Sequence, residues 1–310
     1  MSAHSRFRRA VSGALGAALF AGSAVFASTA LAQPADYSTL EADPAVWHLS
    51  DADSDVYIFG TFHILPPGLD WQTPELQALL ASAETLYLEA DVHSPESQAQ
   101  MQQLVMQHGL NPPGVTLSSL LSAEANAALA EFAPTLGVAP AMLEPMRPWL
   151  AQVMLAVTQM QALGLDPSAG AEAGLLALVA GTDTQMGYFE TAEEQIGFLA
   201  GVSDEVQARA FDQGLEDMVD LPTQLNELVT AWALGDMAVL EEMINGSMRE
   251  GSPEVYETLI VTRNTNWVPQ IAEIMDGEGT VFIAVGAAHL PGEDGVIQLL
   301  QDAGYSISRQ

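Results

Sequence analysis

Two segments near opposite ends of the chain share one pattern of hydrophobic and polar positions. Residues 57–63 and 282–289 are each an apolar run that ends in Gly-x-x-His and continues into a Leu-Pro pair. Buried strands read as continuous apolar runs, so we predict a strand in each. The glycine lets the backbone turn and approach a ligand without a Cβ in the way. We therefore expect His63 and His289 at the carboxyl ends of strands, where open α/β sheets place their active sites.

The pattern between these segments predicts further strands and long helical stretches. Strands are expected at residues 45–49, 56–60, 85–88, 185–189, 281–285 and 305–307. Thr73 before Pro74 and Thr191 before Glu194 are typical helix starts, and Gly304 follows a helix predicted at 295–302. Helical periodicity dominates about 97–163 and 203–276. These elements predict a mixed α/β fold: a central sheet from the N- and C-terminal parts plus a middle strand, with helical insertions between them.

The first 32 residues have the pattern of a secretory signal. Arg6, Arg8 and Arg9 precede an apolar stretch at 11–26, and Ala30-Leu31-Ala32 forms a cleavage site of small residues. We expect the mature chain to begin at Gln33 and to be periplasmic or secreted. Residues 33–310 are expected to form one domain, and no later segment is apolar enough to span a bilayer.

Charge and cysteine content limit the partners and the chemistry. Removing the signal leaves five arginines against 40 acidic residues, a formal charge of −35, and the chain contains no lysine. Such a chain repels phosphate backbones, which disfavours nucleic acid as a partner. With no cysteine, any metal must be held by His, Asp or Glu.

Two glutamates fit the same place at strand ends as the histidines. Glu89 and Glu190 each close an apolar strand, where a carboxylate is costly to bury unless it is paired or binds a metal. Glu190 also precedes a helix start and can simply complement the helix dipole, so we rank Glu89 above it. Asp91 and His93 follow Glu89 at alternating positions and are weaker candidates.

Taken together, these motifs resemble the TraB/GumN family, which includes the Tiki-type membrane proteases. The resemblance spans about residues 46–307 and includes the segments around His63, Glu89 and His289 together with Glu190-Thr191-Ala192-Glu193-Glu194-Gln195 and Arg263-Asn264. It implies a mixed α/β core with both histidines and an acidic residue in one cleft, as in Tiki-type metal-dependent peptidases and the related erythromycin-esterase-like hydrolases. Gly170-Ala171-Glu172 matches a Gly-x-Asp pattern of the family only approximately, which leaves the role of Glu172 undefined.

Arg263 and Asn264 are expected on a helix before the last strand, facing the same cleft. An arginine there suits a developing oxyanion or a substrate carboxylate. The competing interpretation is a buried arginine that neutralises Glu89 or Glu190.

These features predict an exported hydrolase that cleaves a peptide or another amide or ester bond, with a peptide or small molecule as substrate. A divalent metal (Zn, Mn or Co) held by His63, His289, Glu89 and Glu190 would acidify a bound water. Without a metal, His63, His289 and Glu89 would position and deprotonate the water directly. The alternatives are a non-catalytic metal- or haem-binding protein and an accessory protein in envelope polysaccharide processes.

Overall fold

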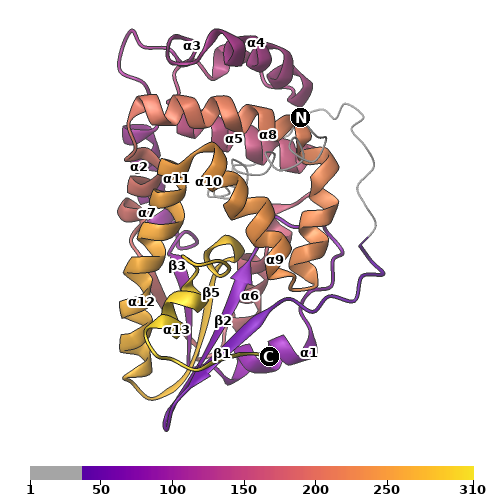
Figure 1. The fold of residues 1–310 in the computed structure, drawn as a ribbon, viewed down its shortest axis with the longest axis vertical. Helices are drawn as coiled ribbons and strands as arrows, with labels where there is room; N and C mark the ends of the chain where they lie inside the picture. Colours follow the sequence, from indigo (N-terminus) through magenta and orange to yellow (C-terminus); the bar gives the residue numbers. More distant parts are fainter. Residues whose placement is uncertain (1–36) are drawn as a thin grey trace.

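The computed structural model describes residues 37–310, and a six-stranded sheet forms its centre (Figure 1). The strands are β1 (Val46–Ser50), β2 (Ser54–Thr61), β3 (Thr85–Ala90), β4 (Gln185–Glu190), β5 (Gly279–Gly286) and β6 (Ile307–Arg309). Their order across the sheet is β4-β3-β5-β2-β1-β6. Strands β4, β3, β5 and β2 run parallel, and β1 and β6 continue the sheet with antiparallel pairing. The predicted mixed α/β fold is thus confirmed.

The strand from the C-terminal part lies inside the sheet rather than at its edge. β5 pairs with β2 on one side and with β3 on the other. In the first of these pairings Thr61 lies opposite Gly286, so both Gly-x-x-His segments leave the sheet from neighbouring parallel strands at the same edge. The middle strand β4 lies at the edge of the sheet, next to β3.

Helices surround the sheet and extend beyond its carboxyl edge (Figure 1). They are α1 (Pro74–Ser82), α2 (Pro95–His108), α3 (Leu117–Leu120), α4 (Ala123–Phe132), α5 (Pro148–Ala162), α6 (Ala171–Val179), α7 (Ala192–Ala200), α8 (Asp204–Ala233), α9 (Met237–Leu240), α10 (Ser247–Gly251), α11 (Pro253–Tyr256), α12 (Thr262–Met275) and α13 (Val296–Asp302). Two π-helical segments, Glu241–Gly246 and Glu257–Val261, lie directly before α10 and α12. Within residues 37–310, no helix is long and apolar enough to cross a membrane.

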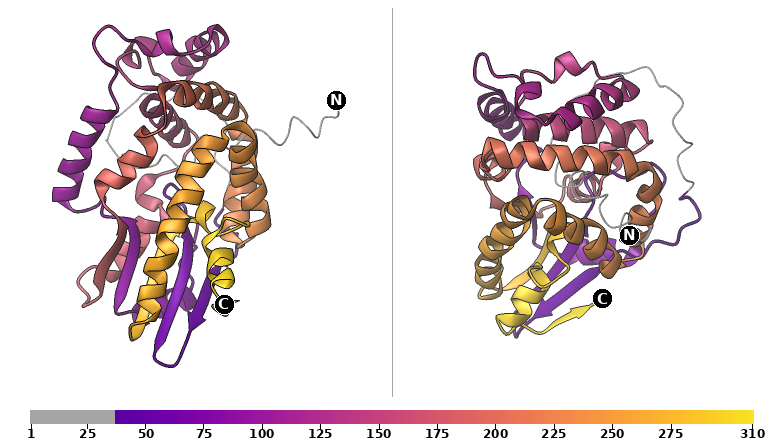
Figure 2. Two further views of the ribbon diagram at one scale, coloured as in Figure 1. Left: turned by 60° about the vertical axis from the view of Figure 1, so that its left-hand side comes forward. Right: turned by 45° about the horizontal axis from the view of Figure 1, so that its top comes forward.

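Each face of the sheet has its own apolar core because side chains alternate along a strand. Ile283 and Val285 of β5 pack with Trp267 of α12 on one face. Phe282 and Ala284 face the other side, in a core that includes residues of α1, α6 and α8. A third core joins α3, α4, α5 and α8 at the end of the molecule away from the β1–β2 turn (Figure 2). The carboxyl edge of the sheet therefore meets this helical part.

Several predicted boundaries are confirmed and others shift. Thr73 caps α1, Thr191 and Glu194 form a capping box on α7, and Gly304 has the positive φ of a helix stop. The last strand begins at Ile307 instead of residue 305, because residues 303–304 form the turn after α13 and residues 305–306 lead out of it without strand pairing. Glu89 is the penultimate residue of β3 rather than its last. The signal peptide predicted at residues 1–32 and the start at Gln33 lie outside the described residues.

Candidate active site

Glu89 turns its carboxylate toward the end of the neighbouring strand β5. Its Oε1 accepts a hydrogen bond of 2.6 Å from the backbone N–H of Gly286. A Cβ on Gly286 would lie only 3.0 Å from that oxygen, so the missing side chain lets the carboxylate reach the strand end. The glycine of the second Gly-x-x-His segment thus both binds Glu89 and makes room for it.

Arg263 of α12 joins the two buried carboxylates. Its Nη2 donates to Glu89 Oε2 at 2.5 Å, and its Nε and Nη2 donate to the two oxygens of Glu190 at 2.8 and 2.9 Å. Trp267 Nε1 donates to Glu190 Oε1 at 2.8 Å. A planar guanidinium suits this two-point contact. Both oxygens of Glu190 are therefore hydrogen-bonded inside the protein, as the competing interpretation of a neutralising arginine describes.

His289 is held as a neutral imidazole with a defined tautomer. Arg263 Nη1 lies 3.0 Å from its Nε2, and because a guanidinium can only donate, Nε2 accepts. The ring proton is then on Nδ1, which donates to Asn264 Oδ1 at 2.7 Å. Burial and the charge of Arg263 lower the pKa of His289 to about 3, against the pull of Glu89. Asn264, fully buried, is therefore a positioning residue behind the ring.

His63, just beyond β2, is paired with a glutamate from a different part of the chain. Its Nδ1 lies 2.8 Å from Glu172 Oε1, and the Thr61 hydroxyl donates to the same carboxylate oxygen. Glu172 lies in the first turn of α6. This helix begins against the His63 backbone, since a Cβ on Gly170 would lie 2.0 Å from the His63 carbonyl oxygen. Gly170 therefore makes possible the close packing that brings Glu172 to His63.

The protonation states of Glu89 and His63 are driven in opposite directions. Burial opposes charge on His63, but Glu172 and Glu89 together outweigh it and raise the pKa of His63 to about 9. Burial also opposes charge on Glu89, but Arg263 and the two histidines hold the pKa of that carboxyl well below its usual range. At neutral pH the site therefore contains a carboxylate and an imidazolium. Two titratable groups whose pKa values are pushed apart are typical of an acid–base pair.

The reactive groups converge at Gly286. From the position that a Cβ would take on this residue, Glu89 Oε1 is 3.0 Å away, His289 Cδ2 3.5 Å and His63 Nε2 4.0 Å. A pocket opens here between the carboxyl edge of the sheet and the helices, and we call it the site pocket. Its lining includes Thr61, His63, Glu89, Gln195, Phe198, Leu199, Met248, Leu259, Arg263, Gly286 and His289.

The match to known proteins covers the whole of this arrangement. The model of the TraB/PrgY/gumN family matches residues 45–309, from the start of β1 to the end of β6. The chain belongs to this family. The uncharacterized protein YbaP of Escherichia coli (strain K12) is 24% identical over 258 residues, which cover 83% of this chain and 92% of YbaP. YbaP of Shigella flexneri is 24% identical over 79% of this chain and 87% of its own length. No solved structure shows a significant match.

Within this TraB/PrgY/gumN chain, the residues singled out from the sequence fall into two groups. Four of them line the site pocket: His63, Glu89, Arg263 and His289. Glu190 and Asn264 lie behind it and hold Arg263 and His289. Asp91 serves elsewhere, because its carboxylate accepts hydrogen bonds from Ser94 and Ser97 at the start of α2.

Glu172 is the residue whose place the sequence left undefined. The signal that pointed to it was the glycine two positions earlier, at the approximate family match. The structure supplies the reason for the glycine, which is the contact with the His63 backbone.

Proposed function

We propose that this protein is an exported hydrolase that cleaves a peptide or another amide or ester bond in the site pocket. One observation carries the proposal: Glu89 Oε1 and His63 Nε2 face the same small volume beside Gly286. Hydrolysis of such a bond needs one group to accept a proton from water and another to supply a proton to the leaving atom. The resemblance to Tiki-type peptidases and erythromycin-esterase-like hydrolases supports the same reaction class.

Glu89 is the group that would receive the proton of the attacking water. It lines the pocket, whereas Glu190 does not, and its charge is preserved by Arg263. The low pKa keeps Glu89 ionised over the physiological range but also makes it a weak base. Much of the rate acceleration must therefore come from positioning the water and from charge stabilisation.

His63 is the group that would supply the proton. Its Nδ1–H is held by Glu172, so the proton on Nε2 is directed at the volume beside Gly286. As the water oxygen attacks the carbonyl carbon, this proton passes to the departing nitrogen or oxygen. The proton taken up by Glu89 then passes to His63, directly or through solvent, which restores both starting protonation states. Arg263 balances the two buried carboxylates during this exchange.

Binding of a divalent metal stays a prediction, and the proton transfers proposed for Glu89 and His63 require no metal. Among residues 37–310, no group of three or more His, Asp or Glu side chains is arranged to hold a metal ion. Arg263 Nη1 lies 3.0 Å from His289 Nε2, and Arg263 donates to Glu89 and Glu190. The guanidinium therefore already contacts three of the four residues that were expected to bind the metal. Metal binding would require Arg263 to withdraw.

The test is a peptide-library cleavage assay with the purified protein, its metal content measured and the assay repeated after chelation. We expect cleavage by wild type and by chelated protein, and none by His63→Asn. His48→Asn is the matched control, because His48 pairs with Asp55 on β2, away from the site. A preparation that carries stoichiometric metal or haem and cleaves nothing would support the binding alternative instead.

A further inference from the structure

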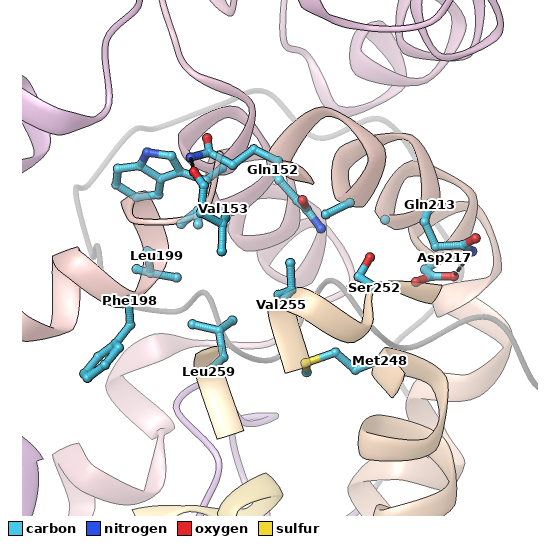
Figure 3. Close-up of a pocket in the computed structure, with 15 residues that line it drawn as sticks. Gln152, Val153, Phe198, Leu199, Gln213, Asp217, Met248, Ser252, Val255 and Leu259 are labelled. Atoms are coloured by element: carbon cyan, nitrogen blue, oxygen red, sulfur yellow. Dashed lines mark hydrogen bonds between the residues drawn. The ribbon is translucent and has the colours of Figure 1, made fainter. Parts of the chain in front are cut away.

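A second pocket lies directly beside the site pocket, and we call it the side pocket (Figure 3). In Figure 3, Phe198, Leu199 and Leu259 gather at one end, and Gln213 and Asp217 lie at the other. Side chains of α5, α7, α8 and residues 252–259 form its walls. Most of these are apolar, including Val153 and Val255. The side pocket is thus mainly apolar, and its polar lining residues are Gln152, Gln207, Gln213, Asp217 and Ser252.

The side pocket adjoins the site pocket. Phe198, Leu199, Met248 and Leu259 line both of them. Leu259 belongs to the π-helical segment that precedes α12, and Arg263 follows one turn later. A group bound at Gly286 therefore has the side pocket as its neighbour, separated only by flexible apolar side chains.

Buried acceptors indicate the chemistry of the occupant. Gln207 lines the side pocket and Gln195 lines the site pocket; the Oε1 atom of neither residue has a hydrogen-bond partner among residues 37–310. Both residues are at least nine-tenths buried. Leaving such an acceptor unpaired is costly, so the two pockets favour an occupant that brings N–H donors. A peptide has backbone N–H groups, whereas a fatty acyl chain has none.

We propose that the side pocket binds a large apolar side chain of a peptide substrate, next to the bond that the site pocket would cleave. This inference rests on the proposed function for the identity of the ligand. The apolar walls take the side chain, and Gln195 and Gln207 accept from the N–H groups of the peptide backbone.

The test measures binding, so it needs no turnover. The probes are acetyl-Gly-Phe-Gly-amide, acetyl-Gly-Gly-Gly-amide and methyl octanoate, titrated calorimetrically into the purified protein. Burial of a phenylalanine ring is expected to make the first probe bind at least about tenfold more tightly than the second. Methyl octanoate, which has no donor, should bind less tightly than the phenylalanine peptide.

Variants then place the bound side chain. Val255→Phe fills the side pocket and should abolish the preference for the phenylalanine peptide. Ala210→Leu fills it from α8 and serves if Val255→Phe does not fold. Glu257→Phe adds the same ring at an exposed position of the neighbouring turn and should leave the preference unchanged.

Two results would overturn the proposal: equal binding of the two peptides, or a phenylalanine preference that survives both filling variants. Tight binding of methyl octanoate that Val255→Phe removes would instead identify an acyl-chain pocket. Cleavage is measured separately. A protein that binds the probes as expected but hydrolyses nothing would contradict the proposed function and would still support binding of an apolar side chain in the side pocket.

Discussion

Glu172 Oε1 lies 2.8 Å from His63 Nδ1, although Glu172 lies in the first turn of α6 and His63 follows β2. This contact decides which histidine of the site carries charge. His289 contacts Arg263 and is neutral, whereas His63 contacts a carboxylate and holds a proton. Two histidines from the same sequence pattern therefore have opposite protonation states because their neighbours differ in charge.

Replacing Glu172 with Gln should lower the pKa of His63 from about 9 toward its ordinary value. The substitution removes the negative charge that raises this pKa but keeps a hydrogen-bond acceptor of the same size. An NMR titration of the His63 ring measures the shift. Asp55→Asn, which changes the partner of His48 instead, is the control and should leave the His63 titration where it is.

Activity should fall as the pH rises through about 9, because His63 then loses the proton that it would supply to the leaving group. The folded state holds the His63 proton more tightly than the unfolded chain, whose histidine pKa is about 6.5. The stabilisation of the fold by the His63–Glu172 pair is therefore complete below a pH of about 6.5 and is lost as the pH passes through about 9. In Glu172→Gln the alkaline limb of the pH–rate profile should move to lower pH. Activity that increases through pH 9 would mean that neutral His63 is the reactive form.

Arg263→Met should destabilise the protein by about 3–5 kcal/mol, because it leaves the buried Glu89 and Glu190 without their cation. The control is Arg209→Met. Arg209 bridges Glu205 and Glu254 with 52% of its side chain exposed, and exposed pairs contribute about 1 kcal/mol or less. Urea unfolding followed by tryptophan fluorescence compares the two. Equal stability of both variants would argue against a buried charge cluster.

Gly286→Ala should reduce activity strongly, because the new Cβ would lie 3.0 Å from Glu89 Oε1 and intrude where the reactive groups meet. Gly197→Ala, in α7, adds a methyl group where no atom lies within 4 Å and should be neutral or slightly stabilising, as alanine favours helix. Rates and thermal unfolding are measured for both. Full activity of Gly286→Ala would show that the reaction does not take place beside this strand end.

The residues of the site were predictable to the extent that they interrupt apolar strands. His63, Glu89 and His289 stand out because a polar group at the end of a buried strand needs a reason to be there. Glu172 does not stand out, since a glutamate in the first turn of a helix is ordinary. Its role follows from the structure, in which the packing of Gly170 against the His63 backbone brings the Glu172 carboxylate to His63 Nδ1.

The arrangement of the sheet was predictable in kind but not in order. Apolar runs at both chain ends predict that they share a sheet, and they do. Nothing in the periodicity shows that β5 inserts between β2 and β3, because a buried parallel strand reads the same at any interior position. The side pocket was equally hidden, since it arises where α5, α7, α8 and the turn before α12 meet.

The most direct test of the account compares Glu89→Gln with Glu190→Gln in one cleavage assay, using the best substrate of the peptide library at saturation. Gln preserves shape and hydrogen bonding but removes the proton acceptor. Glu89→Gln should lose a factor of roughly 10² to 10⁴ in turnover, while Glu190→Gln, checked for folding by circular dichroism, should keep turnover and lose stability. Near-normal turnover of Glu89→Gln beside an inactive but folded Glu190→Gln would contradict the account.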